Sequence, residues 1–149
     1  MVIGAAFALV GVIDLTLMWT PVRFGNPAWE FATLSRTFSN VPLTGLGLLL
    51  VALGLVRHPD WDGLWVRVAA GVFGLVTVLL VVLGVLYLTV LPAVIRETPV
   101  EGLDAVGNTV VKNGVEIVVY PIAFALIAVL LWRGVRKEET ETQEPEARK

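Results

Sequence analysis

The feature that most constrains this sequence is a long stretch without charge. Residues 68–95 contain no Asp, Glu, Lys or Arg and consist mainly of Val and Leu. A helix needs about 20 apolar residues to cross the hydrocarbon core of a bilayer. The stretch can therefore span a membrane, and a helix this long should tilt or project beyond the hydrocarbon. A chain built around such a segment is expected to fold in lipid.

Other apolar stretches support the same conclusion. Hydrophobic residues make up 56% of the chain and the mean hydropathy is +0.81, more apolar surface than a soluble domain of this size can bury. The sequence predicts four transmembrane helices, at about Val2–Trp19, Val41–Val56, Leu64–Leu91 and Val115–Trp132. No Lys or Arg precedes the first stretch and Asp14 lies within it, so we expect a retained helix and not a cleaved signal peptide.

The predicted fold class is an all-α integral membrane protein. Residues 1–133 form the transmembrane domain, and residues 134–149 form a charged tail without apolar periodicity, which is expected to be disordered. The cluster Arg133, Arg136 and Lys137 follows the last span, and basic residues favour the cytoplasmic side. We therefore expect a multi-pass protein of a bacterial inner membrane with both termini in the cytoplasm.

Tryptophans mark the ends of these spans and the first loop. The indole ring prefers the headgroup level of a bilayer. We interpret all five as an interfacial belt and assign none to a ligand; they are Trp19, Trp29, Trp61, Trp65 and Trp132.

The first outer loop contains helix signals of its own. Asn26 is a candidate N-cap and Pro27 suits the first helical position. Phe31, Leu34 and Phe38 then recur on one helical face. This pattern predicts a short amphipathic helix over residues 27–38 on the outer surface, ending before an Asn40 cap for the second span.

The second outer loop shows a similar pattern. Thr98 to Glu101 has the form of a capping box, and an apolar stripe follows it. Asn113 and Gly114 offer a stop before the last span. We therefore expect a second amphipathic surface helix over residues 99–112.

Asp14 is the most informative polar residue because a carboxylate inside a span is costly. One interpretation is an ion pair with Arg23 or Arg36 from the first loop, since an arginine can reach inward along its long stem. The alternative is a proton or cation coupling site. The first interpretation makes Asp14 structural, and the second makes it functional.

Two features of the last span accompany Asp14. Glu116 lies at the outer end, four residues after Lys112, which favours a local ion pair. An alternative arrangement brings Glu116 and Asp14 together in one outer polar pocket. Pro121 should kink the helix because it leaves the carbonyl of Ile117 without its partner. Small residues four apart, at Gly4 and Ala8 and at Ala70 and Gly74, allow close helix packing.

Several function classes find no support in the sequence. The net charge of −2 gives no basic stripe for nucleic acid. There are no cysteines and only one histidine, His58 at the end of a span, so we expect no metal site and no cofactor. No motif typical of nucleotide binding, hydrolysis or metalloprotease chemistry occurs, and the protein is expected not to be an enzyme.

The N-terminal half resembles a known family. Residues 11–15 (GVIDL), 26–30 (NPAWE) and 41–47 (VPLTGLG) are similar to the small cyanobacterial membrane proteins of the HpsJ type, which accompany hormogonium polysaccharide genes. The resemblance covers about residues 11–47. It implies four helices with an amphipathic stretch and an accessory role near surface polysaccharide export, and it carries no catalytic residues.

Two functions remain open at this stage. The first is a non-enzymatic accessory or scaffold subunit of a bacterial membrane assembly, whose partners are lipid and other membrane proteins or further copies of itself. The second is a small oligomeric transporter, coupled to protons or cations through Asp14. The two differ in whether Asp14 tolerates replacement by asparagine.

Overall fold

A computed structural model describes residues 2–56 and 63–143 of the chain. Within these ranges every regular element is helical, which confirms the predicted all-α fold class. The elements in chain order are α1 (Val2–Met18), α2 (Pro27–Val56), α3 (Gly63–Glu97), the short 3₁₀ helix η1 (Val100–Gly102) and α4 (Leu103–Gln143).

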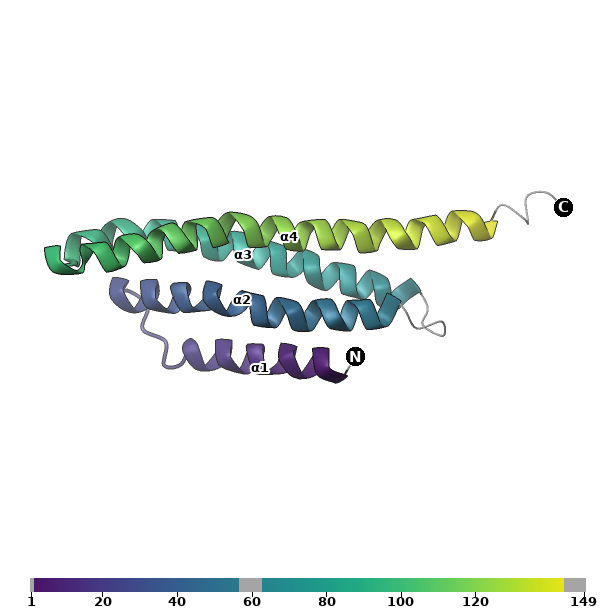
Figure 1. Ribbon diagram of the computed structural model, residues 1–149, viewed down its shortest axis with the longest axis horizontal. Coiled ribbons are helices and arrows are strands. Elements are labelled where there is room, and N and C mark those ends of the chain that lie inside the picture. Colours follow the sequence, from purple (N-terminus) through teal and green to yellow (C-terminus); the bar gives the residue numbers. More distant parts are fainter. Residues whose placement is uncertain (1, 57–62, 144–149) are drawn as a thin grey trace.

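The helices lie lengthwise beside one another in an open arrangement (Figure 1). Helix α2 packs against α1 on one side and against α3 and α4 on the other, while α3 and α4 pair along their length. Helix α1 contacts no helix other than α2 among the described elements. We call the end where α3 turns into α4 the hairpin end, and the end that holds the N-terminus and the last turns of α4 the terminal end.

Three helical segments are long and apolar enough to cross a membrane: α2, α3 and the Val100–Gly134 part of the last helical stretch. The chain is therefore an all-α membrane protein. Helix α3 has 35 residues and is about 52 Å long, which exceeds a hydrocarbon core of about 30 Å, as its sequence indicated. Helix α1 is apolar but has only 17 residues, about 26 Å, and does not reach the length of a full span.

The prediction of two separate surface helices is wrong. Residues 27–38 form the first turns of α2, which continues to Val56 without a break, and residues 103–112 form the first turns of α4. The Asn26 cap is confirmed: its Oδ1 accepts a hydrogen bond from the backbone N–H of Trp29 at 3.0 Å. The capping box at Thr98 is not formed, since its hydroxyl donates backward to the carbonyl of Val94 at 2.7 Å.

Tertiary packing explains why these outer segments join the spans. The apolar stripe of residues 27–38 is covered by α3: Phe31 stacks on Tyr87 with ring centroids 5.3 Å apart, and Phe38 meets the same ring edge to face at 6.2 Å. Leu34 and Phe38 are buried. Because the stripe has a protein partner, the segment does not need to lie on the headgroups, and the helix axis continues into the second span.

The expected disorder of the tail is also corrected in part. Helix α4 does not end near Arg133 but continues as far as Gln143, so residues 134–143 of the predicted tail are helical. A helix that already spans the bilayer presents a preformed end from which further turns can grow without the cost of nucleation. Residues 144–149 lie outside the described ranges, as do His58 and Trp61.

Candidate functional site

Polar side chains gather where α2, α3 and α4 meet, toward the hairpin end. We call this group the polar cluster. Its members come from all three helices, and it consists of Ser35, Ser39, Tyr87, Lys112, Asn113, Glu116 and Tyr120.

One half of the polar cluster surrounds Glu116. Lys112 Nζ lies 3.8 Å from Glu116 Oε1, so the local ion pair predicted from their spacing is confirmed. The same ammonium group donates a hydrogen bond to Ser39 Oγ of α2 at 2.9 Å, and the Tyr120 hydroxyl donates to Glu116 Oε1 at 3.4 Å. The Lys112 side chain is 58% exposed and that of Glu116 only 12%. An exposed ammonium group is therefore paired with a nearly buried carboxylate.

The other half of the polar cluster is more deeply buried. Asn113 is 1% exposed, and its Nδ2 donates to Ser35 Oγ of α2 at 2.8 Å. Tyr87 is also 1% exposed and lies near both residues. Across the described residues, the Tyr87 hydroxyl and Glu116 Oε2 are the buried side-chain polar atoms that lack a hydrogen-bond partner. Burying a polar atom without a hydrogen-bond partner costs free energy. Within the described residues, this cost falls on the polar cluster.

Asp14 does not belong to the polar cluster. It is half-buried on α1, and α2 separates α1 from α4. The pocket in which Asp14 and Glu116 would converge is therefore not formed, because the open arrangement places them on opposite sides of α2. Asp14 and Glu116 therefore do not form the facing pair of carboxylates that general acid–base catalysis can use.

The predicted ion pair of Asp14 is also absent. No nitrogen of Arg23 or Arg36 lies within 4.0 Å of its carboxylate in the described structure. Both arginines are exposed. The residues of α2 that face α1 near Asp14 are polar but uncharged: Asn40 bonds to Gly11 and Thr37 bonds to Trp19. Arg36 adjoins Thr37 in sequence, and its side chain is exposed and not paired with the carboxylate of Asp14.

Close helix packing is confirmed for α1. A Cβ atom on Gly4 would lie 2.7 Å from the Cβ of Leu50, and one on Gly47 would meet the backbone of Ala8. A Cβ on Gly11 would meet Thr44. Glycines on both helices therefore let the backbones of α1 and α2 touch. Gly74, which pairs with Ala70 in the other predicted motif, has open space instead.

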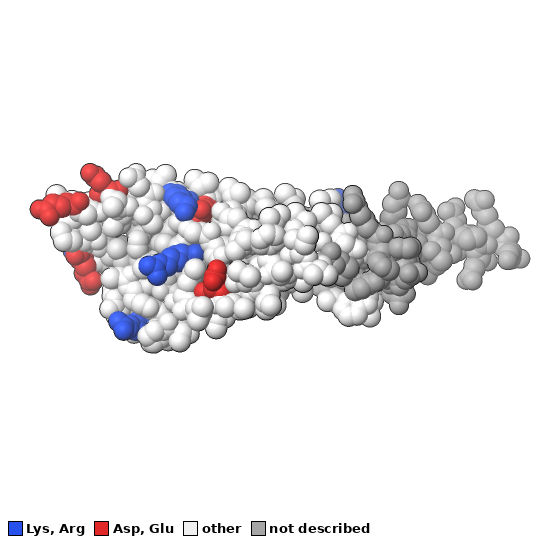
Figure 2. Space-filling model, turned by 60° about the horizontal axis from the view of Figure 1, so that its bottom comes forward, with Lys and Arg blue, Asp and Glu red and all other residues white. Residues whose placement is uncertain are grey.

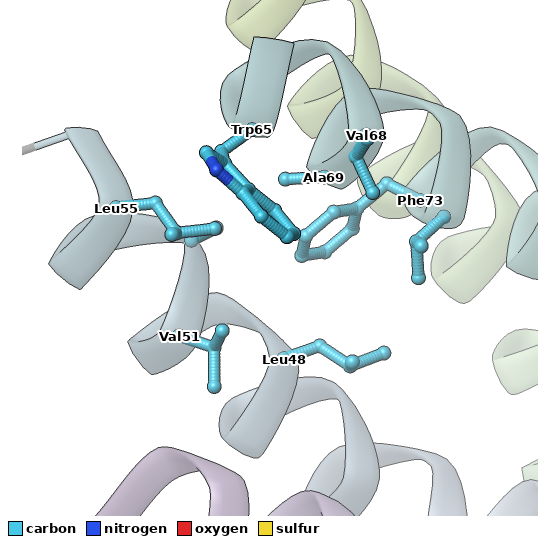
Figure 3. A pocket seen from close by; sticks show the side chains of 9 residues that line it. Leu48, Val51, Leu55, Trp65, Val68, Ala69 and Phe73 are labelled. Atoms are coloured by element: carbon cyan, nitrogen blue, oxygen red, sulfur yellow. The ribbon is translucent and has the colours of Figure 1, made fainter. Parts of the chain in front are cut away.

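The middle of the molecule is apolar. Figure 2 shows most of the charged side chains on that face in the half toward the hairpin end, followed by a stretch without charge toward the terminal end. Between α2 and α3, nearer the terminal end, lies a groove of about 300 Å³ whose lining is apolar except for one indole (Figure 3). It is lined by Leu48, Val51, Ala52, Leu55, Trp65, Val68, Ala69, Val72 and Phe73. The lining of this groove therefore gives the polar cluster no polar continuation toward the terminal end.

The interfacial belt of tryptophans stays a prediction, and four of its five members lie in the described residues. Trp19 and Trp29 lie at the hairpin end, where they pack edge to face at 6.0 Å, and Trp65 and Trp132 lie toward the terminal end. Pro121 is buried inside α4, which continues on both sides of it, and the kink there stays a prediction.

Comparison with known proteins adds no assignment. No protein-family model matches this chain, and no curated protein or solved structure matches it either.

Sequence reasoning missed the importance of Asn113 and of the two serines. Ser35 and Ser39 are four residues apart in α2, a spacing that puts both on one helical face. This spacing of two serines on α2, next to the apolar stripe of residues 27–38, could have predicted a polar face on that helix.

Proposed function

We propose that this protein is a non-enzymatic accessory subunit of a bacterial membrane assembly. In this proposal α1 is a fourth transmembrane helix, and both termini lie in the cytoplasm of the inner membrane. An even number of spans returns the chain to its starting side, and the basic residues after Trp132 favour the cytoplasm for that side. The resemblance of residues 11–47 suggests that the assembly handles surface polysaccharide.

The observation that carries the proposal is that the polar cluster lies toward one end of the helices and is followed by an apolar groove. A transport pathway needs polar groups or water along the membrane depth. The polar cluster ends near Tyr120, and the groove between α2 and α3 beyond it is apolar. Asp14, the residue a coupled transporter would use, faces a single neighbouring helix. Such a chain is suited to holding partners in the bilayer and poorly suited to moving a solute.

The open arrangement of α1 adds a second support. Its side away from α2 carries exposed apolar residues, including Leu9, Val12 and Leu17. Lipid can cover this surface, and so can a helix of another membrane protein or of a second copy. A subunit that is only half surrounded by its own helices leaves room for such neighbours.

The test uses Asp14→Asn, with Asp104→Asn as a matched control at an exposed acidic position of α4. The accessory proposal expects both variants to fold and to co-purify with the same membrane proteins as the wild type in mild detergent. The transporter alternative expects proton-driven uptake in reconstituted liposomes that Asp14→Asn abolishes and Asp104→Asn leaves intact. Uptake with that pattern would overturn the accessory proposal.

A further inference from the structure

A second groove lies between α3 and α4 toward the terminal end. Its volume is about 400 Å³, and it is lined by Ala70, Gly71, Ala128, Val129, Trp132 and Arg133. The hollow exists because three of these residues have no side chain larger than a methyl group. A Cβ atom on Gly71 would meet nothing within 4 Å, so the structure leaves this position open.

The groove has an apolar part and a charged rim. Ala70, Gly71 and Val129 supply the apolar part. Trp132 and Arg133 are exposed at the rim. An indole at a span end settles at the headgroup level of the bilayer. Because Arg133 follows Trp132 directly, we expect its guanidinium to lie at the level of the lipid phosphates.

The sequence contains two further basic residues shortly after Arg133. Because α4 extends to Gln143, Arg136 and Lys137 occupy helical positions three and four residues after Arg133. Positions three and four apart are neighbours on a helix surface. A set of basic positions directly beyond a span attracts anionic lipids.

We propose that this groove binds one anionic phospholipid from the leaflet at the terminal end. An acyl chain lies along Ala70, Gly71 and Val129, and the phosphate pairs with Arg133. Charge complementarity selects this occupant over a second copy of the chain. Two copies packed face to face across the groove would bring their own Arg133 groups together, and like charges oppose such an interface.

The experiment measures lipid binding to the full-length protein in detergent, after removal of native lipid, by native mass spectrometry. The probes are phosphatidylglycerol and phosphatidylcholine with identical acyl chains. We expect one phosphatidylglycerol to be retained in preference to phosphatidylcholine. Arg133→Gln should weaken its binding about fivefold, the effect of one basic residue near a lipid surface. Arg36→Gln, an exposed arginine at the hairpin end, should leave it unchanged.

A second pair of variants tests the apolar part of the groove. Gly71→Leu should fill the groove and abolish the preference for phosphatidylglycerol. Gly74→Leu is the matched control, since it also has open space but does not line the groove. Binding of both lipids equally by the wild type, which needs no variant, would overturn the proposal. So would a dimer that Gly71→Leu dissociates, because the groove would then hold a second copy. The readout requires no partner protein, so it can fail while the accessory function stands.

Discussion

Asn40 of α2 donates a hydrogen bond from Nδ2 to the backbone carbonyl oxygen of Gly11 in α1, with 3.1 Å between the two atoms. A carbonyl oxygen has two lone pairs, so Gly11 can accept this bond as well as one within its own helix. Asn40 is 8% exposed. The bond joins the two helices at Gly11, whose lack of a side chain lets α1 approach Thr44 of α2 closely. Since α1 contacts no other described helix, its position depends on its contacts with α2, which include this bond, the glycine contacts and the hydrogen bond from Trp19 to Thr37.

Replacing Asn40 should loosen α1. Asn40→Leu keeps a side chain of similar size and removes the donor. Hydrogen bonds between membrane helices contribute about 0.6 kcal/mol on average and up to about 1.7 kcal/mol, so the variant should lose stability within that range. Thermal unfolding in detergent measures the loss. Asn108→Leu, at an exposed position of α4, should change stability by less than about 0.5 kcal/mol; an equal loss in both variants would rule out a role for the bond.

A larger residue at Gly47 should separate α1 from α2. Gly47→Leu places new atoms against the backbone of Ala8, which cannot move aside as a flexible side chain could. Overpacking costs about 1–3 kcal/mol, and backbone contact favours the upper part of that range. We expect a lower unfolding temperature and faster maleimide labelling of an introduced Ala8→Cys. Gly74→Leu serves as the control, because it has open space. Labelling that stays slow in Gly47→Leu would contradict the close packing.

Removing the buried amide of Asn113 should lower the stability of the fold more than removing the exposed amide of Asn108. Asn113→Ala removes the donor to Ser35 and leaves a cavity beside Tyr87. The loss of a buried hydrogen-bond partner costs about 1–3 kcal/mol. Asn108→Ala removes an exposed amide from the same helix and should have little effect. Chemical or thermal unfolding of the two variants provides the comparison, and equal stabilities would show that the amide of Asn113 does not hold α2 to α4.

The orientation of the chain can be checked with reporter fusions. A reporter that is active only outside the cytoplasm should be silent after Lys149 and active when inserted between Glu97 and Val100, at the turn between α3 and α4. This follows from four spans and the basic cluster at the terminal end. Activity after Lys149 would mean an inverted chain or an odd number of spans.

Local signals in the sequence predicted that the helices exist but not where all of them begin and end. The charge-free stretch predicted the body of α3, and Asn26 predicted the start of a helix that the structure confirms. Asn40 and Asn113 resemble caps in sequence, because asparagine favours helix ends. In the structure both are buried inside helices, and their side chains bond to Gly11 and Ser35 on neighbouring helices. No local pattern can distinguish these two uses.

The candidate site was predictable only where its residues lie on one helix. Lys112 and Glu116 are four apart on α4, so their pairing follows from helical geometry. The joining of Ser35 and Asn113 depends on which helices touch. Which helices touch also determines that Asp14 lies apart from Glu116, since among the described helices α1 packs on α2 alone. Helix neighbours are a property of the fold that spacing along one sequence does not contain.

In the proposed function, this chain is one component of a larger membrane assembly. The most direct measurement is the mass of the complex extracted from native membranes in polymer-bounded lipid particles, without detergent. We predict a discrete protein mass well above the 16.1 kDa of one chain, made up of further copies or of other membrane proteins in fixed ratio. A protein mass of 16.1 kDa accompanied by lipid alone would contradict the claim.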